Sequence, residues 1–272
     1  EIPGKWGDKK VLLHFQAVDY DTTVWVNGVE VARHRGGFTQ FTCDLEGVAE
    51  PGGKAVIVVR ARDDNRGPMP CGKQAKTYNN RGCVYTRTTG IWQSVWMEPV
   101  PKTYLLRPRI TPDPGSRAFY LDLPVKGNRV GLIVKAVLKD EQGVVSEDSR
   151  PLGSTFTPRL KLELANERMR LWSTEDPFLY DIELEITDNA GNVLDRVKSY
   201  AGMRSVAIDG KAIRINGKSV FQRLVLDQGY YPDGIMTAPT DEALRQDIIL
   251  SMEAGFNGAR LHQKVFEPRF LY

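Results

Sequence analysis

Strand-type patterning dominates this sequence and restricts the folds that it can adopt. Among its 272 residues, only the stretch "TDEALRQDIILSMEAGFN" (240–257) has the periodicity of a clear helix. The preceding two hundred residues consist of short alternating apolar and polar runs separated by turns that contain Gly, Asn and Pro. We therefore predict a mainly β chain made of sandwiches, with a short α/β segment at its C-terminal end.

The first part of the chain predicts a β-sandwich between Val11 and Glu98. Asn27-Gly28 lies between two alternating runs, and this dipeptide is the strongest short signal for a β-hairpin. The polar loop at 63–82 is unusually long for a compact domain. We interpret its residues Lys73, Gln74 and Tyr78 as a mobile surface loop, with a reach toward a binding site as the alternative. Trp92 and Trp96 alternate with Ser94, which favours packing over exposed sugar platforms.

The middle part begins with a connector at 99–115, which holds five prolines. About seven strand-like runs follow within about ninety-five residues, which is typical of an immunoglobulin-like sandwich. This region contains no pair of cysteines, so we expect no disulfide bridge between its sheets.

The last part predicts a strand, a helix and a second strand. The run "FQRLVLD" (221–227) is β-rich, Thr240 is a suitable helix N-cap, and "NGARLH" (257–262) reads as the next strand. Leu244, Ile248 and Met252 fall four residues apart on one helix face. Such a unit opens a parallel α/β layer, and in a TIM barrel the active site lies at the C-terminal ends of the strands.

Polar residues follow both of these predicted strands and are the candidate site residues. Asp227 and Gln228 follow the first strand, whereas Arg260, His262 and Lys264 alternate at the end of the second. A continuous strand would direct the last three side chains to one side. The competing interpretations are a solvated basic strand end, a solvated loop carboxylate at Asp227 and a core position for His262.

Composition excludes several function classes. The net charge is +3 without a run of five basic residues, so we predict no nucleic-acid partner. No run of about 18 apolar residues is present, so we predict no membrane span. Cys43, Cys71 and Cys83 have no metal-site spacing, and reduced thiols are favoured over a Cys71–Cys83 pair. We predict no metal and no cofactor. A homo-oligomer is compatible with the sequence, as is a bacterial cytoplasmic, periplasmic or secreted location.

Five stretches that follow one another along the chain form a recognisable set, namely "VWVNGVEVARHRGGFTQF", "YTRTTGIWQSVWME", "LWSTEDPFLYDIELEI", "INGKSVFQRLVLDQG" and "DEALRQDIILSMEAGFNGARLH". In this order they resemble glycoside hydrolase family 2, which includes β-galactosidases, β-glucuronidases and β-mannosidases. The resemblance implies a jelly-roll sugar-binding domain over 1–100 that lacks its first strands, an immunoglobulin-like sandwich over 101–203 and the start of a TIM barrel over 204–272.

The resemblance also implies a function, namely retaining exo-hydrolysis of terminal β-glycosides, with β-galactosides first and β-glucuronides or β-mannosides next. Both catalytic glutamates of the family are then expected beyond Tyr272, so the chain alone is predicted to be inactive. The resemblance gives Asp227, Gln228, Arg260, His262 and Lys264 roles in carbohydrate binding.

Three departures from the family pattern leave the sugar open. "LHQK" follows Arg260 in place of a Ser-His-Tyr-Pro-like run, "LDQG" replaces Asn-Arg-His, and "NNRGCVYTRTT" has no carboxylate. The alternative function is a non-catalytic carbohydrate-binding or scaffolding module. The strand–helix–strand segment argues against this module, because binding alone does not require it.

Overall fold

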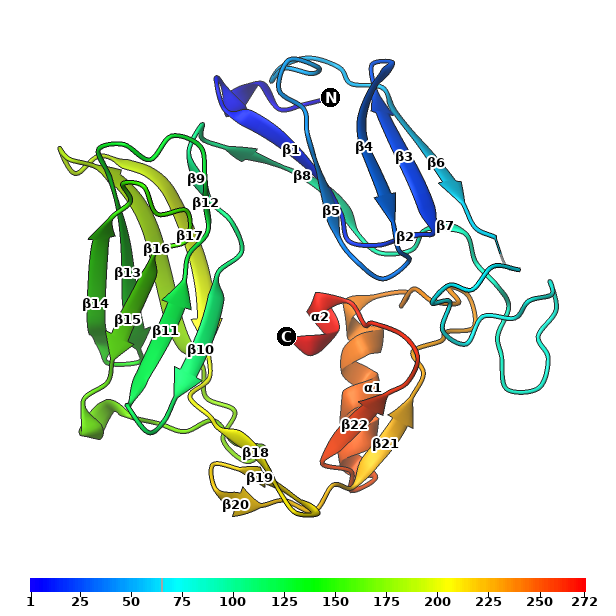
Figure 1. Cartoon of the computed structure of the whole chain (residues 1–272). Helices are drawn as coiled ribbons and strands as arrows, with labels where there is room; N and C mark the ends of the chain where they lie inside the picture. The colour runs from blue at the N-terminus through cyan, green and yellow to red at the C-terminus, as the bar shows by residue number, and fades with distance from the viewer. Residues whose placement is uncertain (65) are drawn as a thin grey trace. The chain divides into compact units, whose positions relative to one another are not determined.

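The computed structural model describes residues 1–64 and 66–272, and it is mainly β, as the sequence predicts. The chain divides into two compact units, which Figure 1 draws as ribbons. Unit 1 combines Glu1–Pro99 with Gln222–Tyr272, and unit 2 comprises Val100–Phe221. The division into three domains at residues 100 and 203 stays a prediction.

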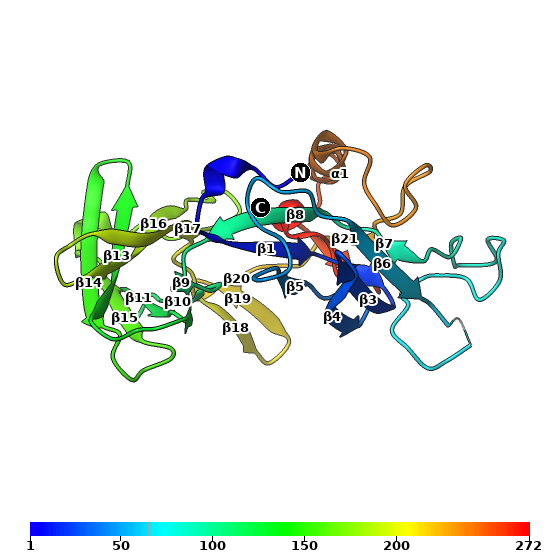
Figure 2. The ribbon, with the colours of Figure 1, turned by 90° about the horizontal axis from the view of Figure 1, so that it is seen from above.

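The N-terminal part of unit 1 is a β-sandwich of two three-stranded sheets, visible in Figures 1 and 2. Their orders are β5-β1-β8 and β4-β3-β6, and β2 pairs with β7 beside them. Both sheets bury apolar side chains in one core, for example Phe15 of one sheet and Val24 of the other. The elements are η1 (Gly4–Trp6), β1 (Lys10–Phe15), β2 (Val18–Asp19), β3 (Asp21–Val26), β4 (Val29–Arg35), β5 (Phe41–Asp44), β6 (Ile57–Arg62), β7 (Gly90–Ile91) and β8 (Val95–Val100).

The hairpin predicted at Asn27-Gly28 is confirmed. Val26 pairs with Val29, and the two residues between them have φ values of 49° and 83°. Asn and Gly tolerate these positive values, so they close a two-residue turn that matches the twist of the strands. The local sequence therefore sets the register of β3 against β4.

The C-terminal part of unit 1 has the predicted order of strand, helix and strand. The strand β21 (Leu224–Asp227) pairs in parallel with β22 (Gly258–Leu261), and α1 (Asp241–Glu253) connects them before the short α2 (Pro268–Leu271). Thr240 caps α1 as predicted, because its side chain accepts a hydrogen bond of 3.1 Å from the N–H of Ala243. Membership of this unit in a TIM barrel stays a prediction.

The apolar face predicted for α1 is only partly covered within the described residues. Leu244 is buried, whereas Ile248 is 40% exposed and Met252 is 64% exposed. The periodicity thus predicted the helix correctly, but burial of its face is limited to the first turns. No helix in the described part of the chain is long and apolar enough to cross a membrane.

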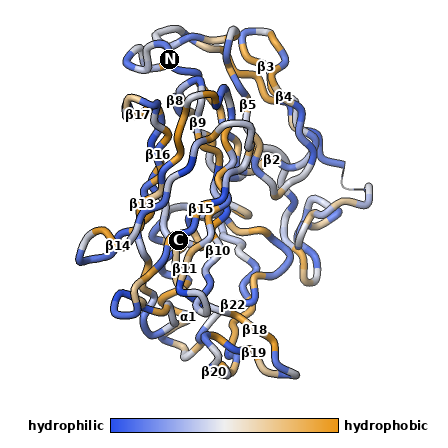
Figure 3. The backbone as a smooth tube through the Cα atoms, turned by 60° about the vertical axis from the view of Figure 1, so that its left-hand side comes forward, coloured by the Kyte–Doolittle hydropathy of each residue, from blue (hydrophilic) through white to orange (hydrophobic). Residues whose placement is uncertain are grey.

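Unit 2 contains a sandwich of a three-stranded sheet, β10-β11-β15, and a four-stranded sheet, β14-β13-β16-β17. The two sheets together have the seven strands predicted for the middle region, and β9 and β12 form an additional two-stranded pair. Side chains such as Phe119 and Ile182 share one core, and Figure 3 shows hydrophobic stretches interrupted by hydrophilic ones along these strands. The elements are β9 (Tyr104–Leu105), β10 (Arg109–Asp113), β11 (Ala118–Asp122), β12 (Val125–Lys126), β13 (Leu132–Asp140), β14 (Gly143–Pro151), β15 (Arg159–Glu163), η2 (Asn166–Arg168), β16 (Tyr180–Asp188), β17 (Val193–Ala201), β18 (Val206–Asp209), β19 (Ala212–Ile215) and β20 (Lys218–Ser219).

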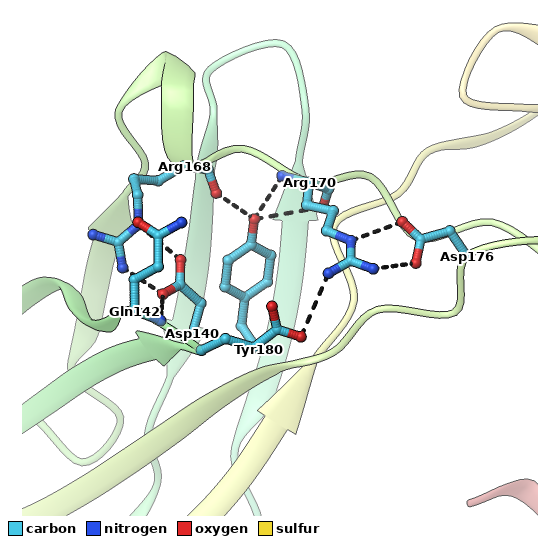
Figure 4. A network of polar contacts seen from close by, with 7 residues as sticks. Asp140, Gln142, Arg168, Arg170, Asp176 and Tyr180 are labelled. Atoms are coloured by element: carbon cyan, nitrogen blue, oxygen red, sulfur yellow. Dashed lines mark hydrogen bonds and ion pairs between the residues drawn. The ribbon is translucent and has the colours of Figure 1, made fainter.

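A fully buried tyrosine fixes the segment that leads into β16. The hydroxyl of Tyr180 accepts a 2.7 Å hydrogen bond from the N–H of Arg170 and donates one of 2.7 Å to the carbonyl of Arg168 (Figure 4). The two arginines extend outward to carboxylates, Arg168 to Asp140 and Arg170 to Asp176. Tyr180 therefore pairs with one backbone donor and one backbone acceptor of this segment.

Candidate functional site

The candidate site lies at the C-terminal edge of the parallel pair β21–β22. Asp227 pairs with Leu261 at this edge, and the N–H of His262 donates a 2.8 Å hydrogen bond to the carbonyl of Asp227. The C-terminal ends of parallel strands open toward the same side of a sheet. The predicted carboxylate and the predicted imidazole therefore share one edge.

Asp227 lines a hollow of about 610 Å³ beside α1, together with Gln228, Tyr231 and Asp247. Its Oδ1 accepts a 2.8 Å hydrogen bond from the N–H of Gly229. Partial burial raises the pKa of Asp227, and the negative charge of Asp247 acts in the same direction, while the Gly229 N–H opposes them. The hollow therefore combines a carboxylate, an amide and a phenol.

The strand register separates Asp227 from Arg260. Leu226, and not Asp227, is the pairing partner of Arg260, and successive side chains of a strand point to opposite faces. Asp227 and Arg260 thus leave the sheet on opposite faces, so they meet only around its edge. That these two residues meet at one rim of the strand ends stays a prediction.

Lys264 does not continue the face of Arg260 and His262. The strand β22 ends at Leu261, and the backbone turns at Gln263, which has a φ of 59°. The side chain of Lys264 is buried, and its Nζ donates to the carbonyls of Gly229 and of Met236, the latter at 2.6 Å. The prediction that one strand directs all three basic side chains to one side is therefore wrong.

Aromatic rings enclose the buried ammonium of Lys264. The Nζ lies 4.9 to 5.9 Å from the ring centroids of Trp92, Tyr230, Tyr231 and Phe266, which is within the range of cation–π attraction. Burial lowers the pKa of Lys264 to about 8, although Glu267 and Asp227 oppose the shift. Lys264 therefore holds the segment after β21 in place through these two carbonyls. Because its ammonium is buried, it is not accessible to a ligand.

Arg260 and His262 form a separate basic group with Lys73. Arg260 is exposed, and His262 and Lys73 are half-buried. Partial burial lowers the pKa of His262, and the positive charges of Arg260 and Lys73 act in the same direction. His262 is therefore neither a fully buried core residue nor a partner of Lys264.

The long loop of the sandwich, which connects β6 to β7 (residues 63–89) and is called the sandwich loop below, reaches this region. The sequence offered this reach only as the alternative. Gly72 approaches Gln263 so closely that a Cβ at position 72 would lie 2.3 Å from the Gln263 carbonyl oxygen. Beyond the loop, the hydroxyl of Thr237 donates a 2.5 Å hydrogen bond to the carbonyl of Trp92. These contacts join the sandwich to the segment after β21. Asn65 of the loop lies outside the described residues.

Gln74 explains why this loop is held in place. Its amide nitrogen donates a 2.7 Å hydrogen bond to Asp19, and its amide oxygen accepts one of 2.7 Å from the N–H of Thr88. Gln74 and Asp19 are both buried, and burial raises the pKa of Asp19 despite the bond from Gln74. The surface-loop interpretation is wrong for Gln74 but correct for Tyr78, which is 83% exposed.

The two alternating tryptophans differ in their surroundings. Trp92 is buried, and its Nε1 donates a 2.7 Å hydrogen bond to the carbonyl of Gly37, as packing predicts. Trp96 is 39% exposed and stacks on His14.

The three cysteines are free thiols. Within residues 1–64 and 66–272, no cluster of three or more His, Cys, Asp or Glu side chains is arranged to hold a metal ion.

Comparison with known proteins shows the family to which the chain is similar. Residues 103–204 match the model of glycosyl hydrolases family 2. A putative β-glucuronidase of Formosa agariphila is 30% identical over 267 residues, which cover 96% of this chain and 31% of that protein. The chain belongs to glycoside hydrolase family 2.

Other family 2 relatives differ in the activity that they are named for. A β-glucuronidase of Paenibacillus borealis is 27% identical over 81% of this chain, and a β-galactosidase of Streptococcus thermophilus is 28% identical over 78%. The chain spans 37% and 20% of the lengths of these two proteins. This family 2 chain therefore corresponds to between a fifth and two fifths of the lengths of these relatives.

A solved structure agrees with the fold of this family 2 chain. The β-glucuronidase of Ruminococcus gnavus in complex with D-glucuronic acid superposes with a TM-score of 0.76 at 24% identity. The match covers 95% of this chain and 44% of that one. At this identity the similarity establishes the fold alone.

The tyrosines that line the candidate site were not singled out by the sequence analysis. Tyr85 stacks on Tyr230 with 4.0 Å between ring centroids, and the hydroxyl of Tyr231 donates a 2.8 Å hydrogen bond to Asp247. The adjacent aromatic pair in "DQGYYPDG" directly after a predicted strand was the available signal. Its partner Tyr85 lies 145 positions earlier, and no local pattern connects the two.

Proposed function

We propose that this chain forms the substrate-positioning part of a retaining exo-β-glycosidase, which releases a terminal sugar from a β-glycoside. The observation that supports the proposal is the hollow at the C-terminal edge of β21. Asp227 and Gln228 line it together with Tyr85 of the sandwich loop. The family resemblance assigns the two catalytic glutamates to other parts of the protein. In retaining enzymes such carboxyl groups lie about 5–5.5 Å apart, one as acid/base and one as nucleophile.

The proposed role of Asp227 and Gln228 is to bind neighbouring hydroxyls of the terminal sugar. Asp227 already accepts the Gly229 N–H at Oδ1, and its other oxygen is proposed to accept a sugar hydroxyl. The amide of Gln228 supplies both a donor and an acceptor. A hydrogen bond to a charged group contributes about 1.5–3 kcal/mol, which is enough to orient one ring.

Arg260 and His262 are proposed to contact the same sugar from the other face of the sheet. This arrangement requires the sugar to lie over the strand ends, where the backbone N–H of His262 is hydrogen-bonded to the carbonyl of Asp227. Lys264 is assigned a supporting role instead of sugar contact, because its ammonium is buried and bound to two backbone carbonyls.

The sugar is proposed to be a β-galactoside or a β-glucuronide. The sequence favours β-galactosides first, and relatives named for both activities match the chain. β-Mannosides are the next class to test.

The test is turnover by a longer protein that contains this chain, on 4-nitrophenyl β-galactoside, β-glucuronide and β-mannoside. Asp227→Asn and Arg260→Ala are each expected to lower kcat/KM about tenfold or more, with little change in melting temperature. Arg245→Ala is the matched control, because Arg245 is exposed on α1 and does not line the hollow.

Two results would reject the proposal. One is absence of turnover on every β-glycoside, which together with retained sugar binding would favour the carbohydrate-binding module. The other is near-normal kcat/KM in both variants, which would make Asp227 and Arg260 structural residues.

A further inference from the structure

The outward face of the sheet β4-β3-β6 carries four arginines. Val24 of β3 lies in the core, and successive side chains of a strand alternate between faces, so Asp21 and Thr23 point away from the core. Each of these two residues has an arginine as its pairing partner on both neighbouring strands, and paired residues share a face. We call this surface the arginine face. Its arginines are Arg33 and Arg35 of β4 and Arg60 and Arg62 of β6.

The four guanidinium groups start from a small area that is open to solvent. Neighbouring strands lie about 4.8 Å apart and residues of one face about 7 Å apart along a strand, so the four Cα atoms span about 10 by 7 Å. The side chains of Arg33 and Arg35 are each 75% exposed, and Arg60 and Arg62 are exposed as well. Like charges this close repel one another, which favours a role in binding over one in folding.

Carboxylates of the same face neutralise only the arginines of β4. Glu30 accepts hydrogen bonds of 2.7 and 2.9 Å from Arg33, and the carboxylate of Asp21 lies 3.1 Å from Nε of Arg35. In the part of the chain that the structure describes, no carboxylate forms an ion pair with either arginine of β6. The face therefore retains an excess of positive charge along β6.

Arg60 is oriented by neutral neighbours, which leave its charge uncompensated. Its Nη2 donates a 3.3 Å hydrogen bond to Oγ1 of Thr23, and its guanidinium lies 5.8 Å from the ring centroid of Trp25. The strand β6 ends at Arg62, directly before the sandwich loop. The cationic strand therefore leads into the loop that lines the hollow with Tyr85.

The ligand that fits this face is a polymer with repeated carboxylates. A guanidinium binds a planar carboxylate through two parallel hydrogen bonds, and Arg33 already binds Glu30 in this way. A single exposed ion pair binds weakly, so several carboxylates on one ligand must act together. Nucleic acid fits less well, because the chain has a net charge of only +3 and Trp25 is covered by Arg60 instead of free to stack on a base.

We propose that the arginine face docks an acidic polysaccharide whose sugar units carry carboxylates, as a site separate from the hollow at Asp227. None of its four arginines lines that hollow. Arg60 and Arg62 bind carboxylates of the polymer directly, and the arginines of β4 add attraction at longer range. The carbohydrate nature of the ligand rests on the proposed function. Docking raises the concentration of the polymer near the hollow.

The test measures binding of polygalacturonate to the 272-residue chain by isothermal titration calorimetry, with dextran as the neutral polysaccharide. Saturable binding of polygalacturonate is expected at about 0.01 M salt, with at least a tenfold loss of affinity at about 0.15 M, because the Debye length falls from about 30 to about 8 Å. Dextran is expected not to bind. Absence of saturable polygalacturonate binding at the lower salt concentration, or equal binding of dextran, would overturn the proposal.

A double variant locates the binding on the arginine face. Arg60→Ala with Arg62→Ala is expected to weaken polygalacturonate binding about tenfold or more. Arg107→Ala with Arg245→Ala is the matched control, since it removes the same charge from exposed positions outside the face and should change the affinity less than twofold. Equal losses in the two double variants would refute the site, because the chain would then respond to net charge alone.

A second double variant has an effect of opposite sign. Asp21→Asn with Glu30→Gln removes the internal carboxylates from the arginines of β4 and is expected to tighten polygalacturonate binding about tenfold. This variant keeps all four arginines, so it tests the face even where the loss of two arginines destabilises the sandwich. Unchanged or weaker binding in it would contradict the proposal.

Dextran sulfate and duplex DNA test the other anions. A larger loss of affinity in Arg60→Ala with Arg62→Ala for either polymer than for polygalacturonate would mean that the face binds sulfate or phosphate, and the proposal would be wrong.

The two proposals fail in different ways. Turnover on a β-glycoside by the longer protein, without polygalacturonate binding to this chain, would reject the docking face and leave the glycosidase proposal intact. Binding that depends on Arg60 and Arg62, without turnover on any β-glycoside, would reject the glycosidase proposal, while the face would still bind an acidic polysaccharide.

Discussion

The buried ammonium of Lys264 gives a stability prediction that depends on pH. The side chain is 9% exposed, bound to two backbone carbonyls and enclosed by four aromatic rings. Its pKa is lowered from 10.5 to about 8 by burial. In Lys264→Met the chain length of the side chain is nearly kept and the charge is removed, so the variant isolates the titration.

The sign and size of the effect follow from the two pKa values. Below pH 8 the ammonium is charged in both the folded and the unfolded chain, and its burial costs the folded state the full penalty. Between about pH 8 and 10.5 the unfolded chain binds more protons than the folded one, so stability rises with pH. One pH unit of pKa difference corresponds to 1.36 kcal/mol, so the penalty is about 3 kcal/mol.

The assay is urea unfolding of the wild-type chain and of Lys264→Met at several values between pH 7 and 10.5. The free energy of unfolding of the wild type minus that of the variant is expected to increase by about 3 kcal/mol across this range. Lys211→Met, which removes an exposed lysine of unit 2, should show a constant difference. A constant difference for Lys264→Met as well would refute the argument, because it would mean that the folded state does not depress the pKa.

Three further predictions concern the rest of the chain. Tyr180→Phe leaves the N–H of Arg170 and the carbonyl of Arg168 unpaired and should lower the free energy of unfolding of unit 2 by about 2–4 kcal/mol in urea, whereas Tyr120→Phe should change it by less than about 0.5 kcal/mol. Gly72→Ala places a Cβ against the Gln263 carbonyl at a positive φ, so amide hydrogen exchange of the sandwich loop should accelerate; unchanged protection would show that this contact does not hold the loop. The 272 residues alone should not hydrolyse the three nitrophenyl glycosides, and turnover above a blank in material free of host enzyme would contradict the assignment of both catalytic glutamates to other parts of the protein.

Elements encoded by neighbouring residues were predictable. The turn at Asn216-Gly217 follows the same rule as the one at Asn27-Gly28, with φ values of 51° and 75° and with Ile215 paired to Lys218. Its geometry depends on the tolerance of two adjacent residues for positive φ, which is a local property. The same holds for the cap of α1 at Thr240, since an N-cap acts on N–H groups within one turn.

The candidate site was predictable in its location but not in its arrangement. The parallel pairing of β21 and β22 follows from the strand–helix–strand pattern, and it brings Asp227 and His262 to one edge. Which face each side chain occupies depends on the exact register, because a shift of one residue exchanges the two faces. The opposite positions of Asp227 and Arg260 therefore required the structure.

The β-rich architecture, the hairpin turns, the capped helix and the membership of glycoside hydrolase family 2 can be predicted from the sequence, because each depends on residues close together or on motifs in a fixed order. The burial of Lys264 under the segment after β21 and the stacking of Tyr85 on Tyr230 are known only from the folded structure. These contacts join residues far apart in the chain. Their formation depends on where strand β22 ends and how the sandwich loop packs, and no periodicity or spacing in the sequence encodes either.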